Sequence, residues 1–198
     1  MEFAEILRKR RMTKVFSREP VSEDVVERIL RAANRGPSAG FSQGYALLVL
    51  TELDDRVAFW RALGQHDIDK GDPVKRAPVI VVPLASKQLY VDRYKQPDKG
   101  WSDRDDDKWP VPYWYIDTGF TALLMMLAAV DEEIGAQFFG ILPPVIDEFR
   151  MQFGVPDTYR PIGAVAIGHR DERLDSHPMW KPKITRKPLD EIVHRGKW

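Results

Sequence analysis

The chain has 198 residues, of which 43% are hydrophobic, 11% aromatic and 30% charged, a composition typical of a globular protein with a real core. Its 30 basic and 30 acidic residues give a formal net charge of zero, so the bulk positive charge expected of a nucleic-acid-binding protein is absent. The sequence has no cysteine, which excludes a disulfide scaffold, a thiolate zinc site, an iron–sulfur cluster and a cysteine nucleophile.

The chain also lacks the usual signals for export or membrane insertion. Residues 1–11 are amphipathic and charged, without a secretory apolar region. We find no apolar run that is long enough to span a bilayer. We therefore expect a cytoplasmic protein with no membrane or nucleic-acid partner, built as a single domain over 1–198 or as one subunit of an obligate dimer.

The first predicted element is a short helix, because Phe3, Ile6 and Leu7 share one helical face. The segment 8–14 (RKRRMTK) follows, and five of its seven residues are basic. Such a run is usually a solvated surface. The alternative is an anion site in which guanidinium groups hold a phosphate or an electron-rich ring.

A second helix is predicted after the N-cap Ser22, because apolar residues recur at helical spacing up to 34–37. The segment 37–44 (PSAGFSQG) then leads into a buried strand over 45–51 (YALLVLT). In the simplest interpretation this segment is a turn. Its small residues, two hydroxyls and one amide would also let backbone donors approach a flat ligand.

The same stretch contains the pattern G-x-S-x-G at Gly36–Gly40, which is typical of a hydrolase nucleophile. That motif requires a strand before it and a helix after it. Here a predicted helix precedes it and a predicted strand follows it. A serine hydrolase that uses Ser38 is therefore kept only as the alternative from a different class.

Val57, Trp60 and Leu63 predict a helix, and 79–82 predicts a second strand. The next stretch, 90–115, reads as a long irregular excursion. A loop of this length is usually either functional or disordered. Disordered segments are poor in aromatic residues, whereas this one is rich in them, so we expect a lid. Its rings are Tyr90, Tyr94, Trp101, Trp109, Tyr113, Trp114 and Tyr115.

Asp117 is expected to cap the longest helix, and Gly135 to stop it. The residues between them are apolar nearly all round, which indicates burial in the core or at a subunit interface. Pro144 starts a further helix that closes near Gly154, and 162–167 is a third strand. The basic, proline-punctuated tail 177–198 is predicted to be an arm, with one short helical pattern near 189–193. This order of elements predicts an α+β fold with a small sheet between helices.

A metal site is not expected. The four histidines show no metal-binding spacing. Asp103, Asp105 and Asp107 resemble the start of a calcium loop, but Lys108 and Trp114 stand where that loop needs Gly and Glu. The sequence contains no G-x-G-x-x-G motif and no P-loop, so the phosphate cradles of dinucleotide folds and nucleotide hydrolases are missing.

Four segments resemble, in order and spacing, the signatures of the nitroreductase family over nearly the whole chain. The segment 10–16 (RRMTKVF) is similar to Arg-Arg/His-Ser-x-Arg/Lys-x-Phe, and 32–45 (AANRGPSAGFSQGY) to Ala-Ala-x-x-x-Pro-Ser-x-x-Asn-x-Gln-Pro-Trp. The strand 163–169 (GAVAIGH) and the tail 186–193 (RKPLDEIV) match the two later segments. Met12, Phe41 and Gly44 stand where the family usually has Ser, Asn and Pro.

The resemblance implies a nitroreductase-like mixed sheet between helices and an intertwined homodimer that binds FMN at its interface. In this interpretation Arg10, Arg186 and Lys187 face the phosphate, and Lys14 faces the N1/O2 edge of the ring. A backbone N–H of the segment 138–141 would reach flavin N5. The cofactor-binding set is Arg10, Arg11, Met12, Lys14, Pro37, Ser38, Ala39, Gly40, Phe41, Gln43, Phe138, Phe139, Gly140, Ile141, Arg186 and Lys187.

The implied activity is a ping-pong oxidoreductase that takes hydride from NAD(P)H and reduces an electron-poor small molecule such as a nitroaromatic or a quinone. No catalytic side chain is required, because the cofactor carries the chemistry. Trp109, Tyr113 and Trp114 are the expected substrate contacts of the lid, since aromatic faces stack on flat acceptors. The remaining alternative is a non-catalytic module that binds a flavin or a deazaflavin.

Overall fold

The computed structural model describes residues 1–67, 69–101, 108–176 and 185–198. The run Asp103, Asp105 and Asp107, which we rejected as a calcium loop, lies outside the described residues. His177 lies outside them as well.

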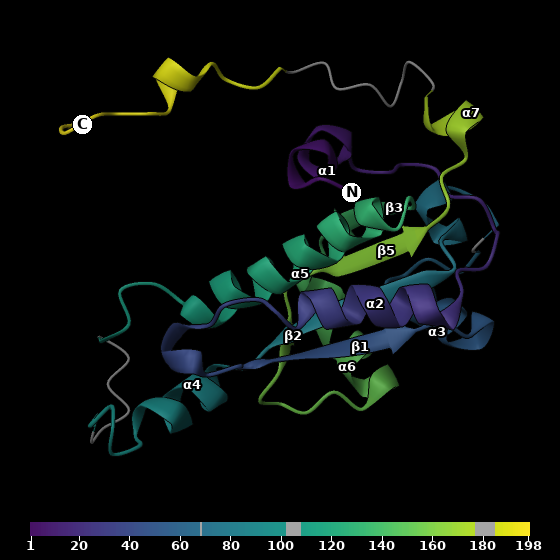
Figure 1. Cartoon of the computed structure of the whole chain (residues 1–198). Helices are drawn as coiled ribbons and strands as arrows, with labels where there is room; N and C mark the ends of the chain where they lie inside the picture. Colours follow the sequence, from purple (N-terminus) through teal and green to yellow (C-terminus); the bar gives the residue numbers. More distant parts are fainter. Residues whose placement is uncertain (68, 102–107, 177–184) are drawn as a thin grey trace.

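The centre of the molecule is an antiparallel sheet in the order β1-β2-β5-β3 (Figure 1). The strands are β1 (Tyr45–Leu50), β2 (Val79–Ala85), β3 (Gly135–Phe139) and β5 (Ala164–Gly168), with the short β4 (Arg160–Pro161) paired to the end of β2. The middle of β2 is hydrogen-bonded on both sides, since Val81 pairs with Val49 and with Val165. β1 and β3 therefore form the two edges of the sheet.

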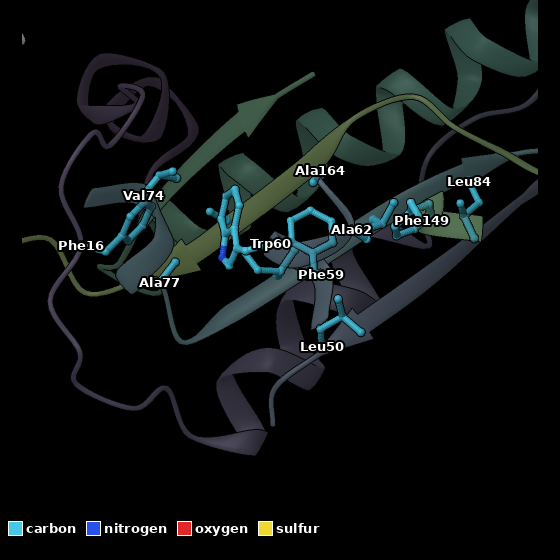
Figure 2. Packing of buried hydrophobic residues seen from close by; sticks show 13 residues of the cluster. Phe16, Leu50, Phe59, Trp60, Ala62, Val74, Ala77, Leu84, Phe149 and Ala164 are labelled. Carbon is cyan, nitrogen blue, oxygen red and sulfur yellow. The ribbon is translucent and has the colours of Figure 1, made fainter. Parts of the chain in front are cut away.

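Helices cover both faces of this sheet. The helices α2 (Glu23–Ala33) and α5 (Tyr113–Asp131) pack on one face, and α3 (Leu53–Ala62) and α6 (Ile146–Phe153) lie on the other (Figure 1). The strands alternate accordingly: Val79 and Val81 join the core under α2 and α5, whereas Ile80 and Val82 join the core under α3 and α6. Figure 2 shows the second core, where Phe59, Trp60 and Phe149 meet the strand residues.

The smaller elements lie around this sandwich. Among the described residues they are α1 (Phe3–Lys9), α4 (Lys87–Tyr94), α7 (Glu172–Asp175) and the short 3-10 helices η1 (Ala39–Phe41), η2 (Pro73–Arg76), η4 (Pro143–Val145) and η6 (Leu189–Glu191).

The predicted α+β layer fold is confirmed, with one refinement. In the part of the chain that the structure describes, the named strands all pair antiparallel, so the sheet is not mixed in the expected sense. Among the described residues, parallel pairing is confined to one isolated bridge between Met12 and Ala136.

Three boundaries differ from the sequence-based expectation. The longest helix begins at Tyr113, one turn before Asp117, so Asp117 is a buried residue inside α5 and not its cap. Gly135 does not stop α5. The helix ends at Asp131, Glu133 takes a left-handed conformation (φ 60°), and Gly135 opens strand β3, which the sequence analysis missed. A Cβ at Gly135 would lie 2.4 Å from the Thr13 Oγ1 atom, so this glycine serves close packing.

The described residues of the excursion 90–115 are more regular than expected. Helix α4 extends to Tyr94, and α5 takes up the last three residues. The sequence analysis missed these helical residues because packing between the aromatic rings, and not a local helical periodicity, stabilises them.

Over the described ranges one helix, α5, is long and apolar enough to cross a membrane by length and composition alone, which the sequence analysis had not recognised. It packs against α2 and three strands of the sheet, and this packing accounts for the apolar residues on its buried side.

Candidate functional site

The basic N-terminal segment runs beside the edge strand β3. Met12 forms the parallel bridge with Ala136, and the Thr13 N–H donates to the Ala136 carbonyl at 3.0 Å. The Thr13 side chain is 1% exposed and fills the space that Gly135 leaves open. The sheet therefore fixes where the cations on either side of Thr13 emerge.

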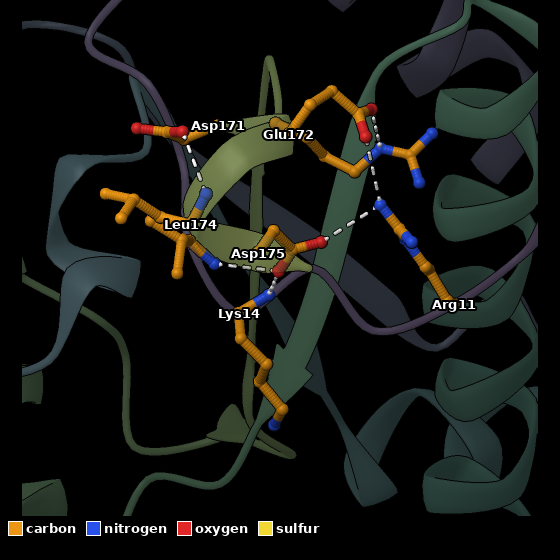
Figure 3. A network of polar contacts seen from close by, with 8 residues as sticks. Arg11, Lys14, Asp171, Glu172, Leu174 and Asp175 are labelled. Carbon is orange, nitrogen blue, oxygen red and sulfur yellow. Dashed lines mark hydrogen bonds and ion pairs between the residues drawn. The ribbon is translucent and has the colours of Figure 1, made fainter. Parts of the chain in front are cut away.

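A buried carboxylate ties this segment to α7 (Figure 3). Asp175 Oδ1 accepts hydrogen bonds from the backbone N–H groups of Lys14 (2.6 Å) and Val15 (3.1 Å). The Arg11 guanidinium lies 3.2 Å from Asp175 Oδ2 and 3.4 Å from Glu172 Oε2. The Asp175 side chain is 2% exposed, so Arg11 compensates a buried charge. The Lys14 side chain points away from these carboxylates (Figure 3).

A groove of about 510 Å³ opens where this segment meets the C-terminal end of α5. Five of its lining side chains are cationic and two are carboxylates. They are Arg8, Lys9, Arg10, Arg11 and Arg170 with Glu133 and Glu172, and Met1 and Val130 complete the lining. A donor set of guanidinium and ammonium groups suits a phosphate dianion, so the chemistry of the groove fits the phosphate end of FMN.

Two buried polar atoms also lie near the β3 edge of the sheet. Thr13 Oγ1 and Gln137 Oε1 are buried and have no hydrogen-bond partner among the described residues. Gln137 lies in β3, next to the segment 138–141 that the resemblance places at flavin N5. Of the four predicted residues there, Phe138 packs against one core and Phe139 and Ile141 pack against the other, whereas Gly140 has no side chain to pack.

The loop 37–43 has an unusual backbone. Gly40, Phe41 and Gln43 all adopt left-handed conformations, with φ of 61°, 54° and 49°. This region is strained for residues other than glycine and often marks functional sites. The Gln43 N–H donates to Ser38 Oγ (3.0 Å) and holds the turn closed, while the Phe41 side chain remains 72% exposed.

Side chains of helices α4 and α5 hold this loop in place by hydrogen bonds. Asp117 Oδ2 accepts hydrogen bonds from the Ala39 N–H (2.8 Å) and from the Tyr90 hydroxyl (2.6 Å). The Arg93 Nε atom donates to the Gly40 carbonyl at 2.9 Å. Burial, followed by the hydrogen bond to Asp117, raises the pKa of Tyr90 well above its ordinary value, so Tyr90 remains a hydrogen-bond donor at any ordinary pH.

Within one chain these two parts of the predicted site lie far apart. The loop leads into β1 at one edge of the sheet, and the basic segment pairs with β3 at the other, about 14 Å away across three strand spacings. They also contact different ends of α5: the loop contacts Asp117, and the groove reaches Val130, about 20 Å further along the helix. The structure thus places Arg10 and Arg11 in the groove, with Met12 and Lys14 next to them in the chain but outside its lining, and it does not bring Pro37–Gln43 to them.

The tail residues are also apart from the groove. Arg186 and Lys187 are exposed on the extended C-terminal segment, which leads away from the sheet past α1 (Figure 1). The three residues predicted to bind the phosphate, Arg10, Arg186 and Lys187, are therefore not brought together within one chain.

The aromatic residues of the predicted lid form a packed cluster. Trp109 lies at its centre, with ring centroids 4.7 Å from Tyr94, 5.0 Å from Trp101 and 6.0 Å from Trp114. Tyr113 contacts the same Trp109 ring at 6.2 Å. Trp114 also lines a second groove, of about 520 Å³, whose other lining residues include Lys87, Tyr115 and Arg160.

The alternative of a serine hydrolase finds no support in this geometry. Ser38 is followed by the turn η1 and strand β1, not by a helix, and its Oγ accepts the Gln43 N–H. No hydrogen bond between Ser38 and a histidine occurs in the part of the chain that the structure describes. The described residues also contain no cluster of three or more potential metal ligands.

Four residues that organise the site were missed or given another role by sequence reasoning. Arg93 and Asp175 were not singled out, Tyr90 was counted among the rings of the lid, and Asp117 was expected to be a helix cap. A single carboxylate within an apolar helix was an available signal for Asp117, because a buried charge needs partners. No local pattern marked Asp175, whose partners are about 160 positions away.

Comparison with known proteins gives one family. The family model described as "Nitroreductase family" matches residues 7–169. An "NADPH-dependent oxidoreductase" of Staphylococcus aureus is 22% identical over 193 residues, which cover 98% of this chain and 72% of that protein.

Solved structures show the same fold. A nitroreductase family protein from Clostridium difficile 630 superposes with a TM-score of 0.71 at 24% identity, with both chains fully covered. A protein from Exiguobacterium sibiricum 255-15, solved in complex with FMN, superposes with a TM-score of 0.72 at 18% identity, covering 98% of this chain and 97% of that one.

Proposed function

The chain belongs to the nitroreductase family, and from this premise we propose that it is an FMN-dependent oxidoreductase that uses NAD(P)H to reduce electron-poor small molecules. The observation that carries the proposal is the cationic groove beside β3, whose donors suit a phosphate. Bound FMN would supply the redox chemistry, accepting a hydride from NAD(P)H and returning the electrons to a nitroaromatic or a quinone.

The residues of the groove would bind the cofactor by charge. Arg10, assisted by Arg186 and Lys187 of the tail, would hold the phosphate, with charge-assisted hydrogen bonds of about 1.5–3 kcal/mol each. Arg11 would add positive charge while it also neutralises Asp175. Lys14 points away from the acidic cluster and would place its ammonium group at the edge of the ring, where a fixed cation favours added negative charge.

The loop 37–43 would line the ring from a second copy of the chain. One chain keeps this loop and the basic segment at opposite edges of the sheet, too far apart to meet on one ring. A homodimer solves this problem, because the loop of each protomer can complete the site of the other. Met12 and Phe41, which replace the usual polar residues, would make the ring surroundings more apolar.

NAD(P)H and the acceptor would bind in turn over the exposed side of the ring. No side chain needs to act as an acid or a base for hydride transfer. Trp109, Tyr113 and Trp114 would supply aromatic surface for flat acceptors, and Trp114 together with Lys87 and Arg160 gives the second groove both stacking and positive charge.

The test is the absorption spectrum of the purified protein, before and after anaerobic addition of NAD(P)H. We expect a yellow protein that releases FMN on denaturation, is bleached by NAD(P)H and regains its colour with a quinone. A flavin that NAD(P)H cannot reduce would favour the rival interpretation of a flavin- or deazaflavin-binding module. A colourless protein that binds no flavin on reconstitution would refute the proposal.

A further inference from the structure

The Asp117 carboxylate joins three separate elements at one buried point. Its residue is 4% exposed, and a single oxygen, Oδ2, accepts both the Ala39 N–H and the Tyr90 hydroxyl. The first donor belongs to the loop 37–43 and the second to α4. A charge inside an apolar helix is costly unless partners compensate it, and here the loop and α4 each supply one donor.

The surroundings of Asp117 leave the loop little freedom. The Tyr90 ring lies against Gly44, where a Cβ would come within 2.3 Å of it, and the Tyr94 ring covers Gly40 in the same way at 2.7 Å. Arg93 holds the Gly40 carbonyl and is itself paired with Asp98 by two hydrogen bonds of 2.7 Å. The strained φ values at Phe41 and Gln43 persist because these contacts over-determine the backbone between them.

We infer that Asp117, with Tyr90, is a positioning residue that preorganises the loop 37–43 for the flavin bound by the partner subunit. Asp117 itself does not touch the cofactor. It acts through the Ala39 N–H, and because the loop and the basic segment of one chain are on opposite edges, it acts on the site of the other chain. The inference rests on the proposed function, since it presupposes a flavin at a dimer interface.

Three variants separate the hydrogen bonds from the charge. Asp117→Asn retains an oxygen that can accept both donors, so the affinity for FMN should stay within about threefold of the parent. Asp117→Leu keeps the branching of the side chain but leaves the Ala39 N–H and the Tyr90 hydroxyl unsatisfied, and should weaken FMN binding about tenfold or more. Tyr90→Phe removes one donor and should have an intermediate effect. Asp92→Leu, which alters an exposed carboxylate on α4, is the matched control.

Affinity is measured by titrating FMN with apoprotein and following the quenching of flavin fluorescence. An Asp117→Leu dimer that binds FMN as tightly as the parent would overturn the inference, as would an Asp117→Asn dimer as weak as Asp117→Leu. If Asp117→Leu does not fold, Asp117→Ala takes its place in every measurement.

A mixed dimer tests the action on the partner directly. One protomer carries Arg10→Ala and the other Asp117→Leu, each with its own affinity tag so that the mixed species can be purified. If the loop acts on the partner, both defects fall in one site and the other site is entirely of parent type, so half of the FMN should bind with parent affinity. A defect confined to its own chain would leave two weakened sites, and that result would overturn the inference.

The mixed dimer also excludes a purely structural role. A globally damaged Asp117→Leu protomer could not provide the intact basic segment that the full-affinity site requires. Failure of the proposed function itself is recognised separately, because the parent protein would then bind no FMN at all.

Discussion

The cations of the basic segment 8–14 have different roles. Arg11 is paired with Asp175 and Glu172, so part of its charge is used to hold α7 against the N-terminal segment. Arg10 lines the groove, and Lys14 points away from the acidic cluster. The sequence shows five basic residues in a row of seven, but only the fold distinguishes the structural cation from those that are available to a ligand.

Arg10→Ala should weaken FMN binding about thirtyfold, because a phosphate contact contributes roughly 2 kcal/mol. Arg186→Ala should have a similar effect if the tail joins the same site. Thermal stability should change little, which calorimetry can check. Arg31→Ala, an exposed arginine on α2, is the control. Parent affinity in both variants would show that the phosphate lies elsewhere.

Gly44 is a position where the surrounding packing leaves no room for a side chain. A methyl group there would lie 2.3 Å from the Tyr90 ring and 3.0 Å from the Ser86 carbonyl. Gly44→Ala should therefore destabilise the fold by about 1–3 kcal/mol and lower the melting temperature by roughly 5 °C. Gly119→Ala is the matched control, because the added carbon would meet no neighbouring atom within 4 Å. Equal melting temperatures for the two variants would contradict the packing described around Tyr90.

At the scale of elements, α4 and the start of α5 form one aromatic unit. Trp109 makes ring contacts with both helices and so joins them. Truncating Trp109 would therefore loosen the support of the loop 37–43. Trp114 differs from it, because Trp114 also lines the second groove. The aromatic composition of 90–115 predicted a lid, and in the described part of that range ring contacts join α4 to the start of α5.

Trp114→Ala should raise the apparent Michaelis constant for aromatic acceptors about tenfold while the FMN content stays unchanged, because one or two stacking contacts are lost. Steady-state kinetics with a quinone and a nitroaromatic measure this. Leu89→Ala, an apolar and partly exposed position on α4, is the control. Unchanged kinetics for every acceptor and for NAD(P)H would remove Trp114 from the substrate site.

At the scale of the whole molecule, α5 presents a row of exposed apolar side chains. Ile116, Phe120 and Leu123 are 39%, 42% and 43% exposed and follow one another at helical spacing. We predict that this exposed apolar face is an interaction surface, and it lies on the helix that connects the two separated parts of the predicted site.

We expect light scattering to show a dimer of the 22.8 kDa chain. The double variant Phe120→Glu/Leu123→Glu should be monomeric and should lose most of its affinity for FMN, although Arg10 and Lys14 remain in place. Met151→Glu changes an apolar residue that is 72% exposed on α6 and should leave the dimer intact. A monomeric variant that still binds FMN with parent affinity would show that one chain forms the whole site.

The sequence by itself determined the helical and strand periodicities, and so the α+β layer fold, α2, β1, α3, α6 and β5. It also determined the basic segment and the loop as candidate ligand-binding segments, because composition and spacing are local properties. Tertiary structure alone decided that Asp117 is a buried hub and not a cap, that Gly135 begins a strand, and that Arg11 is bound to Asp175. It also separated the two parts of the site to opposite edges of the sheet. These features depend on pairings between residues far apart in the chain, which no local pattern encodes.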